Sequence, residues 1–169
     1  MKTVPRVPLT IVLHNIRSAY NVGAVLRTAD VAWIGAVVTS GVTPPADHPK
    51  VKKTALGSES VMRTPRYPTL RATVDALRAD GHTVYAMEIG PASRSLWELP
   101  DADLAAPTAL VFGNEVDGVP LDETRALALP ELMLPQFGVK SSLNVATAAA
   151  ITMYHIRYRL TAAGFLGAP

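Results

Sequence analysis

Apolar residues recur along this chain at two different spacings, and each spacing predicts a different element. Short runs rich in β-branched residues, bounded by polar or turn residues, are typical of buried strands. Four such runs and a weaker fifth are Leu9–His14, Ala36–Thr39, His82–Met87, Thr108–Phe112 and Glu131–Leu134. The pattern therefore predicts strands distributed over most of the chain.

Longer segments between these runs carry apolar residues at helical spacing. The first set is Val22, Val25, Leu26, Ala29 and Trp33, and Asn21 is a suitable N-cap for it. A second helix is predicted over Tyr67–Asp80, stopped by Gly81, and a third from about Ser142 to Ala163, closed by Gly164. Because strands and helices alternate, we expect an α/β fold with a mainly parallel sheet and helices on both faces.

The composition is that of one globular domain. The chain has 169 residues, 49% of them hydrophobic and 18% charged, without an internal repeat or linker. A net charge of +2 and an isoelectric point near 9.0 permit an anionic partner without requiring one. There are no cysteines, and the four histidines lack ligand spacing, so no disulfide or metal site is expected. The absence of a signal peptide or membrane-spanning run predicts a soluble protein of the cytoplasm.

Polar residues follow the predicted strands at three places, where parallel α/β sheets bind their ligands. The first place is NIRSAYNVGAVLRTAD, residues 15–30. On spacing alone, a loop, a capped helix and a solvated Arg27–Asp30 pair would explain it. Two asparagines and two arginines in so short a stretch nevertheless favour a site. The planar guanidinium of arginine can donate two hydrogen bonds to one phosphate group, which indicates an anionic substrate.

The second place is ALVFGNEVDGVP, residues 109–120. Gly113 and Gly118 allow a sharp turn close to a ligand. Glu115 and Asp117 between them can bind ribose hydroxyls, orient a partner or hold a cation. A plain turn with exposed acids is the alternative.

The third place is LPQFGVKSSLNVATAAAITMYH, residues 134–155. Ser141, Ser142 and Asn144 lie where the last helix is expected to begin, so polar side chains and free N–H groups would meet at this sheet edge. A capped core helix would explain the serines but not an asparagine inside the first turn, where the predicted start of the helix puts Asn144.

Several common signatures are absent. The chain has no G-x-G-x-x-G after its first strand, no G-x-x-x-x-G-K-[ST] and no G-x-S-x-G. Their absence argues against an ordinary Rossmann dehydrogenase, a P-loop NTPase and an α/β-hydrolase.

Taken together and in order, the three stretches resemble the motifs of the SpoU/TrmH family of SPOUT RNA methyltransferases. NIRSAYNVGAVLRTAD is similar to the first motif, VFGNEVDGV to the second and LPQFGVKSSLNVATAAAITMY to the third. KTALGSES, residues 53–60, is similar to an intervening segment common among single-domain members. The resemblance extends from about residue 8 to residue 160, nearly the whole chain.

The resemblance implies a fold and an activity that periodicity does not show. Members are α/β domains whose C-terminal part forms a deep trefoil knot, and they work as homodimers. They bind S-adenosylmethionine and methylate the 2′-hydroxyl of an RNA ribose, so tRNA or rRNA is the expected partner. Residues 1–169 would form a single SPOUT domain, with its core at about 8–160 and no appended RNA-binding domain.

By motif position, the resemblance also assigns site residues. The catalytic set is Asn21, Arg27, Glu115, Ser142 and Asn144. The set that would bind S-adenosylmethionine is Val111, Gly113, Asn114, Glu115, Gly118, Leu134, Pro135, Ser142 and Leu143. The set that would bind RNA is Arg17, Lys50, Lys52, Lys53 and Arg63, for whose lysines a solvated face is the alternative.

Methyl transfer to a ribose needs in-line placement and a group that stabilises the developing oxyanion. Arg27 can supply that positive charge, but a guanidinium is a poor general base, so the sequence does not identify the base. The presence of all five catalytic residues favours an active enzyme. The alternatives are a non-catalytic knotted RNA- or nucleotide-binding module that retains the cofactor pocket, and an unrelated α/β enzyme acting on a small nucleotide.

Overall fold

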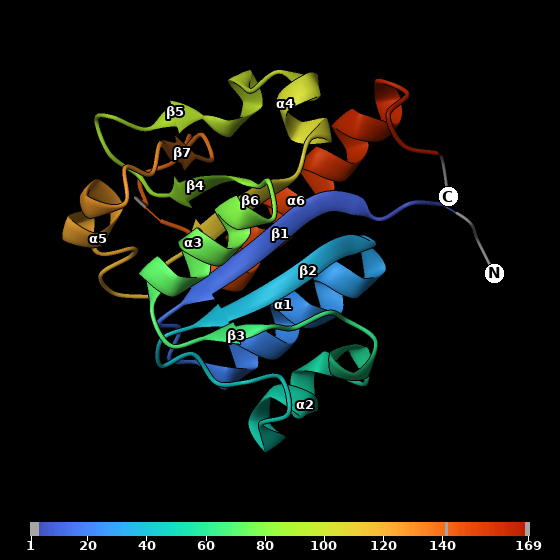
Figure 1. Ribbon diagram of the computed structural model, residues 1–169, viewed down its shortest axis with the longest axis vertical. Coiled ribbons are helices and arrows are strands. Elements are labelled where there is room, and N and C mark those ends of the chain that lie inside the picture. Colours follow the sequence, from blue (N-terminus) through green and yellow to red (C-terminus); the bar gives the residue numbers. More distant parts are fainter. Residues whose placement is uncertain (1–3, 141, 168–169) are drawn as a thin grey trace.

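A seven-stranded sheet forms the centre of the molecule in the computed structural model, which describes residues 4–140 and 142–167 (Figure 1). The strands are β1 Val7–His14, β2 Ile34–Ser40, β3 Arg66–Tyr67, β4 Thr83–Met87, β5 Arg94–Ser95, β6 Thr108–Phe112 and β7 Glu131–Met133. Their order is β3-β2-β1-β6-β4-β7-β5, and each neighbouring pair is parallel. The predicted parallel α/β sheet is confirmed.

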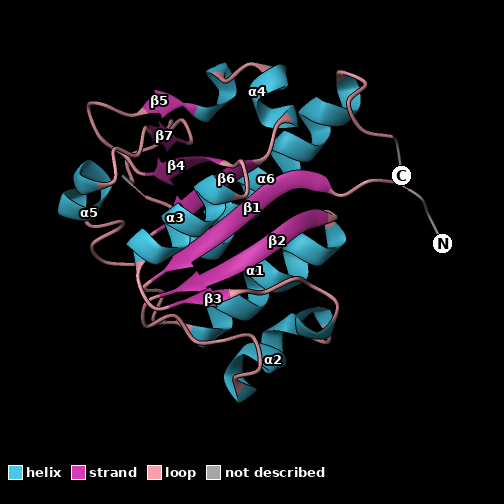
Figure 2. Ribbon diagram, in the orientation of Figure 1, coloured by secondary structure: helices cyan, strands magenta, loops and turns pink. Residues whose placement is uncertain are grey.

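Helices cover both faces of this sheet, as predicted (Figure 2). The helices are α1 Ala19–Val31, α2 Pro49–Ala55, α3 Leu70–Ala79, α4 Asp101–Ala105, α5 Leu121–Ala126 and α6 Val145–Ala162, with short 3-10 turns η1 Ser58–Ser60 and η2 Leu96–Glu98. Within the described ranges, no helix is both long and apolar enough to cross a membrane.

Alternating side chains of β1 separate two layers of the core. Ile11 and Leu13 pack in the cluster that contains the buried residues of α1 and α6, whereas Val12 packs with the buried residues of α3. This alternation follows from the period of two along a strand. In a sheet buried on both faces it gives the continuous apolar runs from which β1 and β6 were predicted.

Two helix starts differ from the prediction. Asn21 is not the N-cap of α1, because Ser18 holds that position and its hydroxyl accepts from the Asn21 N–H. Asn144 does not lie inside the first turn of α6 but is its N-cap, with Oδ1 2.9 Å from Ala146 N and 3.3 Å from Thr147 N. Ordinary capping thus accounts for the Oδ1 of Asn144 and leaves its Nδ2 free for another contact.

The elements missed by the sequence prediction are the shortest ones. Strands β3 and β5 have two residues each, and helices α2, α4 and α5 have five to seven. Segments this short do not complete a recognisable period. Predicted element ends move by a few residues, as at Thr69, which caps a helix expected to begin at Tyr67.

Helix α1 packs closely against α2 at Gly23. A Cβ at this position would overlap Thr54 Oγ1 and the carbonyl oxygen of Val51. In an open helix, replacing glycine by alanine stabilises by about 1 kcal/mol, but overpacking costs about 1–3 kcal/mol. We expect Gly23→Ala to lower the free energy of unfolding, measured by urea denaturation. Gly138→Ala is the control, because no heavy atom lies within 4 Å of its Cβ position. A more stable Gly23→Ala protein would contradict the packing argument.

Candidate active site

A pocket of about 530 Å³ lies beyond the carboxyl ends of β4, β6 and β7. Parallel strands bring these three ends to one edge of the sheet, although they are far apart in the sequence. The lining residues are Met87, Glu88, Ile89, Phe112, Gly113, Asn114, Glu115, Val116, Asp117, Gly118, Met133, Leu134, Gln136, Ser142, Leu143, Asn144, Val145 and Ala148.

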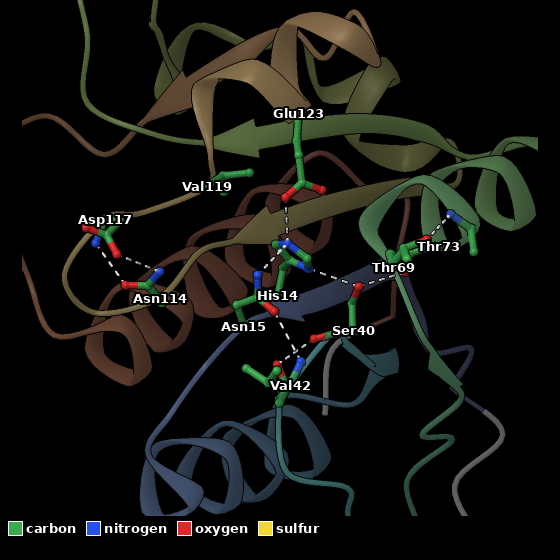
Figure 3. Close-up of polar contacts among 12 residues, drawn as sticks. His14, Asn15, Ser40, Val42, Thr69, Thr73, Asn114, Asp117, Val119 and Glu123 are labelled. Carbon is green, nitrogen blue, oxygen red and sulfur yellow. Dashed lines mark hydrogen bonds and ion pairs between the residues drawn. The ribbon is translucent and has the colours of Figure 1, made fainter.

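The loop after β6 is a tight turn that requires both of its glycines. Gly118 has a φ of +68°, and a Cβ at Gly113 would overlap the backbone of Gly118. Asn114 and Gly118 exchange backbone hydrogen bonds of 3.1 and 3.0 Å. The Asn114 Oδ1 also accepts from Val116 N at 2.8 Å. It accepts from Asp117 N at 2.8 Å as well (Figure 3). This geometry confirms the predicted sharp turn and points Glu115 toward α1.

Glu115 connects the three sequence motifs at the mouth of the pocket. Its Oε1 accepts from Asn21 Nδ2 at 2.9 Å, and Asn144 Nδ2 donates to Asn21 Oδ1 at 3.3 Å. Its two oxygens also accept from the backbone N–H groups of Arg17 and Ser18, each at 3.3 Å. Three of the five residues of the predicted catalytic set therefore form one hydrogen-bonded group.

These contacts change the ionisation of Glu115. Partial burial would raise its pKa, but the hydrogen bonds from Asn21 Nδ2 and from backbone N–H groups outweigh it, so the pKa lies below its ordinary value. The carboxylate therefore stabilises the fold above its unfolded-state pKa, and this contribution is lost as the pH falls through the lower folded-state pKa.

Glu88, at the end of β4, has the opposite shift. Burial raises its pKa, and the charge of Glu131 adds to this, against a hydrogen bond from Val119 N. The pocket thus has one carboxylate held ionised and another that is protonated more easily.

The structure places most predicted cofactor residues in this pocket. Gly113, Asn114, Glu115, Gly118, Leu134, Ser142 and Leu143 line it, as does Asn144. Val111 does not line it, because this side chain is buried in β6 on the α3 side of the sheet, and Pro135 does not line it either. Ser141 lies outside the described residues.

Sequence reasoning missed the contribution of β4 to the pocket. Met87, Glu88 and Ile89 line it, yet they occur in the stretch MEIG, which matches none of the three motifs. Only the strand order, with β4 between β6 and β7, places them there. No local sequence signal indicates that order.

Arg27 does not line the pocket with the other residues of the predicted catalytic set. It lines a separate hollow of about 530 Å³ between α1, α2 and Tyr154 of α6. Arg27 follows Asn21 by six positions. On a helix this places it about 9 Å further along the axis and about 120° around it. Asp30 does not form the ion pair considered for Arg27 but accepts from Ser58 Oγ at 2.9 Å.

The predicted RNA-binding residues are all exposed. Lys50, Lys52 and Lys53 lie on α2, and Lys53 lines the same hollow as Arg27. Arg63 follows η1, and Arg17 lies in the loop before α1. Within residues 4–140 and 142–167, no carboxylate is within 4.0 Å of any of these five side chains.

A parallel sheet covered by helices, with a polar pocket beyond its strand ends, is the arrangement of an α/β protein with its candidate site at the usual edge of the sheet. The model of the SpoU rRNA Methylase family matches residues 8–154. The chain is 32% identical over 161 residues to the tRNA (guanosine(18)-2'-O)-methyltransferase of Thermus thermophilus, which covers 95% of this chain and 80% of that relative. This chain therefore belongs to the SpoU rRNA methylase family.

Other relatives are longer than this chain. The 23S rRNA (guanosine(2553)-2'-O)-methyltransferase RlmP of Bacillus subtilis is 35% identical over 152 residues, 87% of this chain and 57% of its own length. An AdoMet-bound rRNA methyltransferase from Sinorhizobium meliloti has a TM-score of 0.79 at 26% identity, over 90% of this chain and 56% of that one. A putative RNA methyltransferase of the TrmH family from Porphyromonas gingivalis has a TM-score of 0.79 at 30% identity. The match covers 94% of this chain and 62% of that one.

We expect Asn21→Ala to raise the pKa of Glu115, because the strongest hydrogen-bond donor to its carboxylate is removed. The pKa can be measured by NMR titration of the carboxyl carbon. Asn144→Ala is the control, since Asn144 contacts Asn21 and not Glu115, and it should move that pKa less. A Glu115 pKa that is the same in wild type and Asn21→Ala would show that the side-chain contact does not hold the carboxylate.

Proposed function

We propose that this chain is an S-adenosylmethionine-dependent RNA methyltransferase, which transfers a methyl group to a ribose 2′-hydroxyl of tRNA or rRNA. The observation that carries the proposal is the Glu115–Asn21–Asn144 group, because it joins all three motifs at the mouth of one pocket. The names of the similar tRNA and rRNA methyltransferases support it. Since these RNAs are modified inside the cell, we expect the protein to act in the cytoplasm.

The pocket fits S-adenosylmethionine in size and chemistry. Its volume of about 530 Å³ falls in the range of small-molecule sites, roughly 300–1,000 Å³. Phe112, Leu134 and Val145 provide apolar surface for an adenine ring. Three carboxylates, together with the loop backbone, provide acceptors for hydroxyl and ammonium groups; they are those of Glu88, Glu115 and Asp117. Gly113, Asn114, Gly118, Ser142 and Leu143 would hold the cofactor, which supplies a methyl group on a positively charged sulfur.

Asn21 would position the ribose at the mouth of this pocket. Its Nδ2 donates a hydrogen bond to Glu115, and its Oδ1 accepts one from Asn144. The direction of the amide is therefore fixed before substrate binds. Preorganised polar groups of this kind lower the barrier because they need not reorient during the reaction. Ser142, which lines the same pocket, would complete this polar wall.

Arg27 would stabilise the developing oxyanion from a second copy of the chain. It lines a hollow that shares no residue with the pocket of its own chain, so in this proposal the arginine comes from the partner in a homodimer. The exposed residues Ile151, Tyr154 and Tyr158 form an apolar stripe on α6, which supports a subunit contact there. Tyr154 also lines the hollow of Arg27, so that contact would adjoin the arginine.

The proposed C-terminal trefoil knot agrees with the order of the strands. Strand β7 follows β4 and β5 in the sequence but lies between them in the sheet. The chain on either side of β7 then reaches α5 and α6, and the segment before α6 lines the same pocket as the loop after β6. In this proposal residues 1–169 form a single domain, and each site combines the pocket of one copy with Arg27 of the other.

The RNA can be identified by mapping 2′-O-methylated nucleotides in tRNA and rRNA from a deletion strain. A site that is lost on deletion and restored by the purified wild-type protein with S-adenosylmethionine would establish the activity. Binding of cofactor and RNA without transfer to any RNA would favour the non-catalytic module instead.

We expect Arg27→Ala to fold and to bind S-adenosylmethionine, but to lose about 10²-fold or more in methyl transfer, as the removal of an oxyanion-stabilising donor does elsewhere. Single-turnover transfer rates and calorimetry with the cofactor would measure the two effects. Arg27→Lys keeps the charge without the planar fork and should retain part of the rate. Near-wild-type transfer by Arg27→Ala would rule out this role.

Mixed dimers test the two-chain arrangement directly. Arg27→Ala and Asn144→Ala homodimers should each be impaired, whereas a heterodimer of the two has one site in which both residues are intact. We expect mixing and subunit exchange to restore part of the activity. If mixing restores nothing although exchange is demonstrated, the arginine and the pocket of one site come from the same chain.

Lys52→Ala combined with Lys53→Ala should weaken RNA binding and flatten its salt dependence, because each lost phosphate contact lowers the slope of log K against log salt by about 0.7–0.9. Binding isotherms at several salt concentrations would measure the slope. The control is the double variant Asp75→Asn with Asp80→Asn, far from α2 on α3 and its C-cap. An unchanged slope in the lysine variant would remove these lysines from the interface.

A further inference from the structure

A second pocket, of about 680 Å³, lies beyond the carboxyl ends of β1, β2 and β3. Its walls include His14, Asn15, Arg66, Tyr67 and Glu123. Of the described residues that line it, none belongs to the cofactor pocket or to the Glu115–Asn21–Asn144 group. The proposed methyl transfer therefore leaves this pocket without a role.

A hydrogen-bonded chain fixes the buried histidine of this pocket on one side (Figure 3). His14, which is only 2% exposed, has Nδ1 3.0 Å from Ser40 Oγ, and Ser40 Oγ is 3.0 Å from Thr73 Oγ1. Thr73 Oγ1 donates to the carbonyl of Thr69 at 2.9 Å. A carbonyl can only accept, so the Thr73 proton is used there, and Ser40 supplies the proton between the two hydroxyls. The proton on Nδ1 of His14 is thus donated to Ser40.

Asn15 fixes the other ring nitrogen of His14. The backbone N–H of Val42 donates to Asn15 Oδ1 at 3.1 Å, which turns Nδ2 toward the ring, 3.0 Å from His14 Nε2. Nε2 must then accept, so the imidazole is neutral. Burial, which lowers the pKa of His14 more than the charge of Glu123 raises it, acts in the same direction.

Glu123 consequently presents its carboxylate to the pocket, where its side chain is 36% exposed. Its Oε1 lies 3.4 Å from His14 Nε2, a nitrogen that has no proton to give. Among the described residues, no other group donates to this carboxylate or forms an ion pair with it. Arg66 in the same pocket is exposed and has no carboxylate within 4.0 Å in the described ranges. The pocket therefore offers a carboxylate, a guanidinium and the apolar surfaces of Tyr67 and Pro68.

These groups match one nucleobase better than the others. Guanine has adjacent N–H donors at N1 and N2, which a carboxylate can accept together, and acceptors at O6 and N7, which arginine recognises. Unpaired RNA bases are read by such edge contacts and by stacking on aromatic side chains or guanidinium planes. We propose that this second pocket binds a guanine of the substrate RNA, with its N1 and N2 hydrogens donated to Glu123.

The position of the second pocket suits a methyltransferase, and the inference rests on the proposed function in this respect. Asn15 lines the second pocket, and Arg17, whose N–H binds Glu115, is two residues further along the chain. Their Cα atoms are at most about 7 Å apart. The second pocket and the Glu115–Asn21–Asn144 group therefore adjoin the same short loop between β1 and α1.

Binding of free nucleotides tests the pocket without methyl transfer. GMP, AMP, CMP and UMP would be titrated separately into the wild-type protein at up to millimolar concentration, with the imidazole nitrogen signals of His14 as the NMR probe. We expect GMP to bind at least about ten-fold more tightly than AMP, and Glu123→Gln to weaken GMP about ten-fold or more, because hydrogen bonds to a charged group are lost. Arg66→Ala should weaken GMP as well.

Asp122→Asn is the matched control, since it makes the same charge change on the neighbouring, exposed residue of α5 outside the pocket. Equal affinity for GMP and AMP, an unchanged GMP affinity in Glu123→Gln, or no shift of His14 by GMP would each overturn the assignment. With substrate RNA, Glu123→Gln should raise KM more than it lowers kcat.

The two proposals can fail separately. Methyl transfer by a wild-type protein that binds no GMP would leave the proposed function in place and overturn the guanine pocket. Glu123-dependent binding of GMP by a protein that methylates no RNA would support the pocket and refute the proposed function.

Discussion

The carboxylate of Glu115 holds the candidate active site together. It is on the loop after β6, yet it accepts hydrogen bonds from Asn21, 94 residues earlier, and from the two N–H groups that precede α1. Each such bond contributes modestly at an exposed site, but together they determine where α1 starts relative to the pocket. Through this one carboxylate the pocket is joined to the start of α1.

The alternation of apolar runs was sufficient to predict the sheet. Thr108–Phe112 was predicted with its observed bounds because Pro107 and Gly113 interrupt the pattern on both sides. The two-residue strands β3 and β5 were not predicted, since two residues cannot show a period. Asn21 was expected to cap α1, but Ser18, three residues earlier, has the extended backbone and the hydroxyl that a cap needs.

The site was predictable where residues are joined by motif and unpredictable where they are joined by topology. Gly113, Asn114 and Ser142, which belong to two of the motifs, line the same pocket. Glu88 reaches it through the position of β4 in the sheet. The placement of Arg27 outside the pocket follows from helix geometry, which the letters of a linear motif do not display.

The position of β7 has a consequence for how the chain acquires its structure during synthesis. Residues 94–95 of β5 pair with residues 132–133 of β7, which in turn pairs with β4. The edge of the sheet at β5 thus stays unpaired until the chain has been made almost forty residues further, a long-range pairing of the kind that slows folding. A ribosome-bound chain that ends before β7 has the pocket residues of β4 and of the loop after β6 but lacks those from Met133 to Ala148. Its sheet and its pocket are both incomplete, so ligand binding requires synthesis well beyond β7.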